Sequence, residues 1–253
     1  MAFAVFFVYL SVKKMQYEPD IKVIGFDADD TLWDNEPHYR ALEQIFCELV
    51  RPYLPQEEAS RALYKTEVGN MPLYGYGAKA YTLSIIETAL EVSGHRIPAS
   101  DIRKILDAGK KLADSPIRLL DKVEDVLKQL SRNYTLIVAT KGDLLDQERK
   151  LRKSGLATFF HHIEIMSDKQ TRDYKKLFRH LDIPAEHFLM VGNSIRSDIL
   201  PVIELGGYAV HIPYHTTWLH EQVDEQPDLP DDRFMGIPSI ALIPEMCPWI
   251  TIT

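Results

Sequence analysis

Cysteine is scarce in this chain: its 253 residues include two, Cys47 and Cys247. The two share no metal-site spacing with histidine partners, and they are too few to build a disulfide framework. We therefore expect free thiols in a reducing compartment, and a cytoplasmic protein. The sequence leaves a single disulfide between them open.

Positive charge is also in short supply. The formal net charge is −8 at pH 7, the sequence pI is near 5.6, and no basic patch stands out. This balance lacks the electrostatic footprint of a nucleic-acid-binding protein, so we expect no nucleic-acid partner.

The first residues contain no hydrophobic run long enough to cross a membrane. Met1–Leu10 is apolar, but it has only about half the length of a membrane span. Lys13 and Lys14 come after the apolar stretch, and no small-residue cleavage site follows, unlike in a secretory signal. We expect no membrane association and interpret residues 1–14 as a non-native or mobile extension, with Met15 as the natural start. The alternative is an extra strand or a partner-binding arm.

Hydrophobic residues make up 45% of the chain and charged residues 26%, as in ordinary soluble domains. Short apolar runs bounded by polar breaks predict buried strands, and apolar residues at i, i+3, i+4 spacing predict helices. The predicted strands are Ile21–Phe26, Tyr134–Ala139, Ile163–Met166, Phe188–Val191 and Tyr208–Ile212. The predicted helices among them are Asp121–Ser131, Leu144–Ser154, Asp173–Leu181 and Asp198–Leu205. Repeated strand–helix units imply a parallel sheet and an α/β fold.

Residues 35–116 contain helix-period stretches and no strand-like runs. The predicted helices there are His38–Leu54, Glu57–Val68, Lys79–Ser93 and Ser100–Leu112. We therefore divide the chain into a core of residues 15–34 and 117–253 and a helical insert of residues 35–116. Near the end we expect a surface loop at Gln222–Asp232 and an edge strand within Ile240–Thr253.

Acidic side chains gather directly after the first predicted strand. Asp27, Asp29, Asp30 and Thr31 follow it at its carboxyl end, where open α/β sheets bind their ligands. Burying like charges side by side is costly, so a fold that does this has a reason. We favour a divalent cation at this point, with Asp27 free to act as a nucleophile. The alternative is a solvated acidic turn.

The strand Tyr134–Ala139 is followed by Thr140, Lys141 and Gly142. A hydroxyl and consecutive backbone N–H groups ahead of a helix form a cradle for an anion. The alternative is that Thr140 merely caps the helix that begins near Leu144.

Two more strand ends carry polar residues. Lys169 follows the third strand and is able to neutralise a phosphoryl oxygen, although lysines at strand ends are usually solvated. Asn193 and Asp198 follow the fourth strand and offer an amide oxygen and a carboxylate to a cation. The alternative there is a glycine-containing turn, with Asp198 at the start of a helix.

Together these four segments resemble the four-motif signature of the haloacid dehalogenase-like (HAD) hydrolase superfamily, roughly from Lys22 to Ile212. The resemblance implies a Rossmann-like, three-layer α/β core with an inserted α-helical cap of the C1 type. It also implies a Mg²⁺-dependent phosphatase that acts on a small phosphorylated metabolite, such as a sugar phosphate, phosphoglycolate or a nucleoside monophosphate.

The same resemblance assigns roles to residues of this chain. Asp27 would form an aspartyl-phosphate and Asp29 would act as general acid and base. The phosphoryl group would be bound by Thr140, Lys141 and Lys169. The Mg²⁺ ligands would be drawn from Asp27, the backbone carbonyl of Asp29, Asn193 and Asp198.

Two residues depart from the family pattern. Asn193 stands where an aspartate is frequent, which removes a negative charge and predicts weaker Mg²⁺ affinity. Lys141 stands where many relatives have asparagine, so it either favours more anionic substrates or points to solvent.

Other reaction classes remain open at this stage. The 2-haloacid dehalogenases lack an acid two residues after the nucleophile, so Asp29 favours phosphate-ester chemistry. Phosphonate cleavage would need an amine from the cap, for which Lys65 and Lys79 are candidates. A hexose-type phosphomutase and a non-catalytic binding or regulatory protein are the alternatives. The sequence predicts no oligomeric state.

Side chains of the insert and its hinge are candidates for the substrate pocket, namely Trp33, His38, Arg40, Tyr74 and Tyr76. The histidine pairs His161-His162 and His211/His215 have no nearby acid at metal-site spacing. We therefore expect these histidines to be structural or to lie on the surface.

Overall fold

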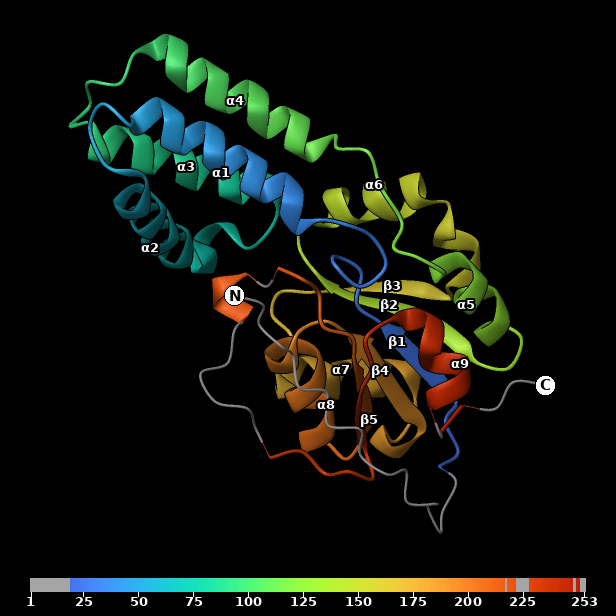
Figure 1. The fold of residues 1–253 in the computed structure, drawn as a ribbon. Helices are drawn as coiled ribbons and strands as arrows, with labels where there is room; N and C mark the ends of the chain where they lie inside the picture. Colours follow the sequence, from blue (N-terminus) through green and yellow to red (C-terminus); the bar gives the residue numbers. More distant parts are fainter. Residues whose placement is uncertain (1–18, 217, 222–227, 248, 251–253) are drawn as a thin grey trace, which may run out of the picture.

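Six parallel strands form a single sheet in the order β3-β2-β1-β4-β5-β6 (Figure 1). The computed structural model describes residues 19–216, 218–221, 228–247 and 249–250. The strands are β1 Val23–Phe26, β2 Thr135–Lys141, β3 His162–Met166, β4 Phe188–Gly192, β5 Tyr208–His211 and β6 Phe234–Gly236. The predicted parallel α/β fold is confirmed. Residues 1–14 and Met15 lie outside the described residues.

Alternate side chains of the central strands enter two different cores, one on each face of the sheet. Ile24 and Phe26 of β1 belong to one core, and Val23 belongs to the other. Successive residues of a strand point to opposite faces, so a strand covered on both sides is apolar throughout. This is the reason why β1 is buried at all four positions. The sheet is therefore the middle of three layers.

Helices cover both faces of the sheet. The first core receives α5 (Val123–Leu130), α6 (Leu144–Ser154) and α9 (Ile243–Met246), and the second receives α7 (Thr171–Leu181) and α8 (Leu200–Glu204). Short 3₁₀ segments connect them at Leu156–Phe159, Ala185–His187, Leu219–Glu221 and Ile240–Leu242, and a π-helical turn spans Ile195–Ile199.

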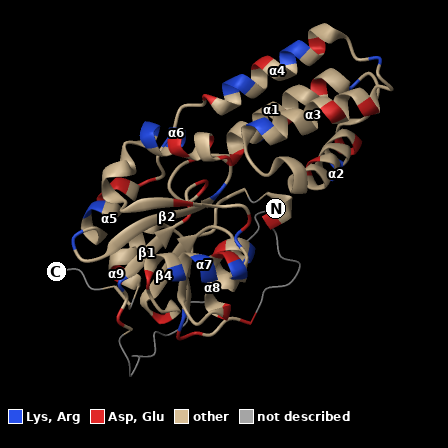
Figure 2. Ribbon diagram, turned by 180° about the vertical axis from the view of Figure 1, so that it is seen from behind, with Lys and Arg blue, Asp and Glu red and all other residues tan. Residues whose placement is uncertain are grey.

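Four further helices lie between β1 and α5 in the chain and form a separate body at one end of the core (Figure 1). They are α1 Glu36–Val50, α2 Gln56–Tyr74, α3 Ala78–Val92 and α4 Ala99–Ala113. This four-helix body, which we call the cap, has its own buried core, which contains Phe46, Ile85 and Ile105. Acidic and basic side chains are interspersed along its helices (Figure 2).

Two short chain segments connect the cap to the core and pair with each other. The Asp34 N–H donates to the carbonyl of Arg118 at 3.0 Å, and the Leu120 N–H donates to the carbonyl of Leu32 at 3.0 Å. Asp30 adopts a left-handed backbone conformation, and its carboxylate accepts the backbone N–H groups of Asn35 and Glu36 at the start of α1. The hinge therefore consists of two hydrogen-bonded chain segments, which we call the ribbon, and α1 begins directly after the first of them.

The prediction of an edge strand within Ile240–Thr253 is wrong for the part of that range that the structure describes. Residues 240–246 form a 3₁₀ turn followed by α9, and the sheet edge is β6 instead. Ile240 and Ile243 are three residues apart and both pack into the first core, which is a helical spacing. Pro244 also lacks the N–H that a strand ladder needs.

Both cysteines are buried free thiols, with Cys47 in the cap and Cys247 in the first core, so no disulfide joins them. Of the helices within the described ranges, none combines the length and the apolar character that crossing a bilayer requires.

Helices α4 and α3 pack so closely that their contact requires a glycine at position 109 of α4. A Cβ added at Gly109 would lie 2.3 Å from Thr82 Oγ1 and 2.9 Å from Thr82 Cβ. Thr82 is buried and β-branched, so it has little freedom to move aside. We expect Gly109→Ala to lower the free energy of unfolding by about 1–3 kcal/mol, as overpacking does. Urea denaturation followed by circular dichroism measures this.

Gly69 in α2 is the matched control, since a Cβ there would meet nothing within 4 Å. Gly69→Ala should raise the free energy of unfolding by up to about 1 kcal/mol through helix propensity. A stabilising effect at both glycines would contradict the close contact at Thr82.

Candidate active site

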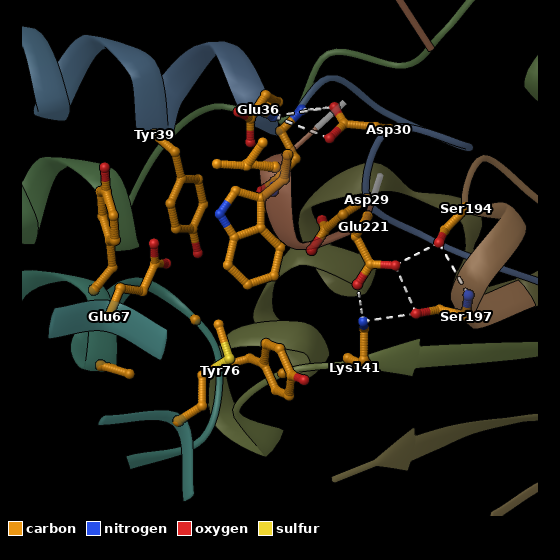
Figure 3. Close-up of a pocket in the computed structure, with 18 of the residues that line it drawn as sticks. Asp29, Asp30, Glu36, Tyr39, Glu67, Tyr76, Lys141, Ser194, Ser197 and Glu221 are labelled. Carbon is orange, nitrogen blue, oxygen red and sulfur yellow. Dashed lines mark hydrogen bonds and ion pairs between the residues drawn. The ribbon is translucent and has the colours of Figure 1, made fainter. Parts of the chain in front are cut away.

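The polar residues predicted at four strand ends converge on one cavity. Strands β3, β2, β1 and β4 are neighbours in the sheet, so their carboxyl ends share one edge. A cavity of about 490 Å³ lies there, between the sheet edge and the cap. Every predicted site residue lines it, namely Asp27, Asp29, Thr140, Lys141, Lys169, Asn193 and Asp198. Figure 3 shows part of this cavity.

Lys169 lies at the bottom of the site, between two carboxylates. Its ammonium donates to Asp27 Oδ1 and, at 2.6 Å, to Asp198 Oδ1. Its side chain is only 1% exposed. The alternative of a solvated strand-end lysine is therefore wrong, and the site joins residues that follow β1, β3 and β4.

Asp27 is buried in surroundings that favour its neutral form. Burial raises the pKa of Asp27 to about 7, and repulsion from Asp198 adds to this, while Lys169 opposes it. The alternative of a solvated acidic turn does not hold for this carboxylate. Two carboxylates against one lysine leave a negative excess in a desolvated place, which a bound cation would relieve.

Oxygen atoms suited to a hard cation lie next to Asp27. The hydroxyl of Thr31 lies 3.2 Å from Asp27 Oδ2 and 3.3 Å from Asn193 Oδ1, so these two oxygens share one neighbour. Carboxylate and amide oxygens are the donors that Mg²⁺ prefers. Asp198, in contrast, directs Oδ1 to Lys169 and Oδ2 to the backbone N–H of Ser194 at 3.0 Å.

The segment that carries Asn193 and Asp198 is shaped by reciprocal capping. Ser194 Oγ accepts the Ser197 N–H at 3.0 Å, while the Asp198 carboxylate accepts the N–H of Ser194. A Cβ at Gly192 would lie 2.2 Å from Asp198 Oδ2, so only glycine allows this approach. The resulting π-helical turn is a rare form that is frequent at functional sites.

Asp29 is held by three donors. Trp33 Nε1 donates to Oδ1 at 2.7 Å, and Gln147 Nε2 and Lys150 Nζ reach Oδ2 at 3.0 Å and 2.9 Å. Trp33 is a buried residue of the hinge and does not line the cavity. Sequence reasoning missed Gln147 and Lys150. Their i, i+3 spacing on the helix that follows Thr140 was the available signal.

Thr140 is buried, and its hydroxyl accepts a hydrogen bond from Gln147 Nε2 at 3.2 Å. The alternative that Thr140 caps α6 is wrong. Asp143 caps that helix by accepting the Asp146 N–H at 3.2 Å.

Lys141 is paired with an acid that the sequence gave no reason to suspect. Its ammonium contacts the Glu221 carboxylate, donates to Ser197 Oγ at 2.9 Å and lies 4.9 Å from the centre of the Tyr76 ring (Figure 3). Glu221 also accepts the hydroxyls of Ser194 and Ser197. Burial opposes ionisation of Glu221, yet Lys141 and the hydroxyls lower its pKa to about 2. Lys141 therefore neither points to solvent nor carries an uncompensated charge.

The cap side of the cavity carries aromatic and acidic side chains, together with Arg40 and Arg61. Tyr39, Tyr76 and Glu67 project into it (Figure 3), and burial raises the pKa of Glu67 to about 8. The other aromatic and acidic residues that the cap contributes are Tyr64, Tyr81, Glu36 and Glu43, and the segment after β5 adds Trp218.

Of the pocket residues predicted from sequence, Arg40 and Tyr76 line the cavity, and His38 and Tyr74 do not. Neither Lys65 nor Lys79 lines it, and Lys79 instead pairs with Asp143 at 2.8 Å. The lysines of the cavity are Lys141, Lys150 and Lys169, and each is paired with a carboxylate. A free amine for imine formation with a phosphonate substrate is thus not found among the described residues of the cavity.

Comparisons with known proteins agree with the fold and the motif order. The family model of haloacid dehalogenase-like hydrolases matches residues 21–206. The HAD-hydrolase YfnB of Bacillus subtilis is 26% identical over 227 residues, which cover 83% of this chain and 88% of YfnB. The crystal structure of a haloacid dehalogenase-like family hydrolase from Xanthomonas campestris matches with a TM-score of 0.78 and 36% sequence identity. The match covers 88% of this chain and 89% of the Xanthomonas chain.

More distant structures share the fold and carry different activities in their names. A 2-haloacid dehalogenase from Pseudomonas syringae is 18% identical with a TM-score of 0.61, covering 91% of this chain and 100% of its own. A predicted phosphoglycolate phosphatase from Haemophilus somnus is 20% identical, with a TM-score of 0.57. The match covers 88% of this chain and 96% of the phosphatase chain. The fold alone therefore does not select the reaction.

The buried Lys169 should be essential for stability. In Lys169→Met, Asp27 and Asp198 lose their shared cation, and we expect the free energy of unfolding in metal-free buffer to fall by about 3–5 kcal/mol. Adding Asp198→Asn removes one of the two carboxylates and should recover part of this loss. Lys79→Met, at the exposed pair with Asp143, is the control and should cost less than about 1 kcal/mol. Urea denaturation compares the variants, and equal losses at the two lysines would contradict the buried pair.

Glu221 should make stability depend on pH. Its pKa is about 2 in the folded protein against an ordinary value of 4.5, so its contribution is complete above pH 4.5 and is lost as the pH falls toward 2. We expect Glu221→Gln to be less stable than the wild type at neutral pH, with a gap that narrows below pH 4.5. Urea denaturation over this range tests it, with the exposed Glu186→Gln as control. A gap that is independent of pH would be incompatible with the charge pairing.

Proposed function

The chain belongs to the haloacid dehalogenase-like hydrolase family, and from this premise we propose that it is a Mg²⁺-dependent phosphatase of small phosphorylated metabolites, acting through an aspartyl-phosphate on Asp27. The observation that carries the proposal is Asp29. This second carboxylate lines the cavity two residues after the nucleophile, and its three donors keep it oriented. Cleavage of a carbon–halogen bond has no use for an acid there, whereas a leaving alkoxide needs a proton.

The residues present fit Mg²⁺. The Asp27 carboxylate, the Asn193 amide oxygen and the backbone carbonyl of Asp29 would hold it, and Asp198 would support them through Lys169 and Ser194. When bound, the ion would neutralise charge on the phosphoryl oxygens, which a carboxylate nucleophile needs before it can approach phosphorus.

The other catalytic roles belong to groups of the protein itself. Asp27 attacks phosphorus, so that its new O–P bond forms while the bond to the leaving oxygen breaks. Lys169, the Thr140 hydroxyl and the backbone N–H at Lys141 stabilise the phosphoryl oxygens. In its protonated form, Asp29 would give a proton to the leaving oxygen and would then take one from the water that releases phosphate and regenerates Asp27.

The aromatic lining of the cavity suits a leaving group that has a ring. The cavity volume suits a small metabolite. Glu36, Glu43 and Glu67 line the cap side together with Arg40 and Arg61, and the aromatic rings there offer stacking surfaces. Since Lys141 is already paired with Glu221, a carboxylate such as that of phosphoglycolate finds no free cation at Lys141. Among the expected substrates, a sugar phosphate or a nucleoside monophosphate fits better.

The first test is hydrolysis of para-nitrophenyl phosphate with and without Mg²⁺. We expect Mg²⁺-dependent turnover that Asp27→Asn abolishes and that Asp29→Asn lowers by about 10²- to 10⁴-fold. Asp30→Asn is the matched control. The Asp30 carboxylate accepts backbone N–H groups at the start of α1, and the side-chain oxygen of an asparagine is able to accept them as well.

The competing functions give different results in the same series. Metal-independent chloride release from 2-chloropropionate would identify a dehalogenase and overturn the proposal. Interconversion of hexose phosphates without net phosphate release would identify a phosphomutase. If Mg²⁺ binds but no phosphometabolite is turned over, a binding or regulatory protein is indicated.

A further inference from the structure

A second cluster of possible metal ligands lies away from the cavity. His162 and Glu164 belong to the edge strand β3, and His180 lies in the last turn of α7. One nitrogen from each histidine and one oxygen from Glu164 all lie within 4.8 Å of one another. The expectation that the His161-His162 pair has no nearby acid at metal-site spacing is therefore wrong for His162. Glu164 is two residues away on the same strand face, and the fold adds His180.

The distances in this cluster are close to those between the ligands of one metal ion. Glu164 Oε2 lies 3.4 Å from His180 Nδ1 and 3.8 Å from His162 Nε2. Ligands that a tetrahedral zinc holds at roughly 2.0 to 2.1 Å lie about 3.4 Å apart. Small side-chain rotations would bring all three atoms onto one ion, with a position left for water.

The orientation of His162 adds independent support. Its Nε2 is buried and makes no hydrogen bond to any residue that the structure describes. Its other nitrogen, Nδ1, lies 3.0 Å from His161 Nδ1. Metal-binding histidines characteristically engage the second ring nitrogen in a hydrogen bond, which fixes the ring and leaves the first nitrogen for the ion.

We propose that His162, Glu164 and His180 bind a divalent transition metal ion, for which Zn²⁺ is the best match. Two imidazoles and one carboxylate suit zinc, whereas Mg²⁺ prefers an all-oxygen shell. The site is therefore selective against the ion proposed for the cavity.

The position of the cluster indicates a structural ion. His162 is opposite Ile137 near the amino end of β3, whereas Met166 is opposite Lys141 at the carboxyl end, where the cavity lies. The ion would join β3 to the end of α7, and the loop between these two elements carries Lys169. Because an ion that binds only the folded chain stabilises it, zinc should reinforce the unit that positions Lys169.

The test is isothermal titration of the chelator-treated, full-length protein with Zn²⁺ while Mg²⁺ is in excess. We expect one high-affinity zinc per chain and a rise in melting temperature. Loss of a group that merely orients a ligand costs about 10- to 100-fold in affinity, so Glu164→Gln and His180→Gln should each cost at least about 100-fold. With Co²⁺ as the probe, visible absorption bands of a tetrahedral ion should appear and vanish in both variants.

His95→Asn is the control, since it removes an exposed histidine of the cap and asparagine tolerates the left-handed backbone there. It should bind zinc as the wild type does. Zinc affinity that is unchanged in Glu164→Gln and His180→Gln, or absence of tight zinc binding by the wild type, would overturn the proposal. Circular dichroism checks that each variant is folded, and neither result depends on phosphatase activity.

Discussion

The ammonium of Lys169 between the carboxylates of Asp27 and Asp198 is the interaction on which the rest of the site depends. It ties together the chain segments that follow β1, β3 and β4, all at one edge of the sheet. Its cost is the burial of three charges, which only mutual contact makes tolerable. Two features hold Asp198 in place for this contact. The backbone N–H of Ser194 donates to its carboxylate, and Gly192 has no Cβ to block the approach of that carboxylate.

A second set of contacts links the cap hinge to Asp29. Trp33 lies in the ribbon that joins cap and core and donates to Asp29, while Lys150 bridges Asp29 and Asn35, the residue just before α1. A rotation of the cap about this ribbon must strain or break one of these contacts. The orientation of Asp29 is therefore coupled to the position of the cap. Under the proposed function, this coupling would link substrate enclosure to proton transfer.

The sequence was informative where a residue's neighbours along the chain determine its place. Asp27, Thr140, Lys169 and Asn193 each follow a short apolar run, and parallel strands bring such positions together without further information. Glu221 was missed because its partner Lys141 is distant in sequence and nothing in its local pattern distinguishes it from a solvated surface residue. Lys150 also has a distant partner, Asp29, and its spacing from Gln147 was the only local signal. The edge strand was misplaced for a similar reason, since a short apolar run near the chain end has no helix length to reveal its period. The roles of the predicted site residues stay predictions.

Charge balance gives Asn193 a physical meaning. Asp27, Asp198 and Lys169 already leave the buried site with an excess of one negative charge, and burial with the repulsion of Asp198 brings the pKa of Asp27 to about 7. A further carboxylate at position 193 would increase the repulsion and favour the protonated, non-nucleophilic form of Asp27 when no cation is present. The amide supplies a similar oxygen without that charge. Under the proposed function, the amide would keep Asp27 closer to its ionised form in exchange for a weaker attraction of the cation.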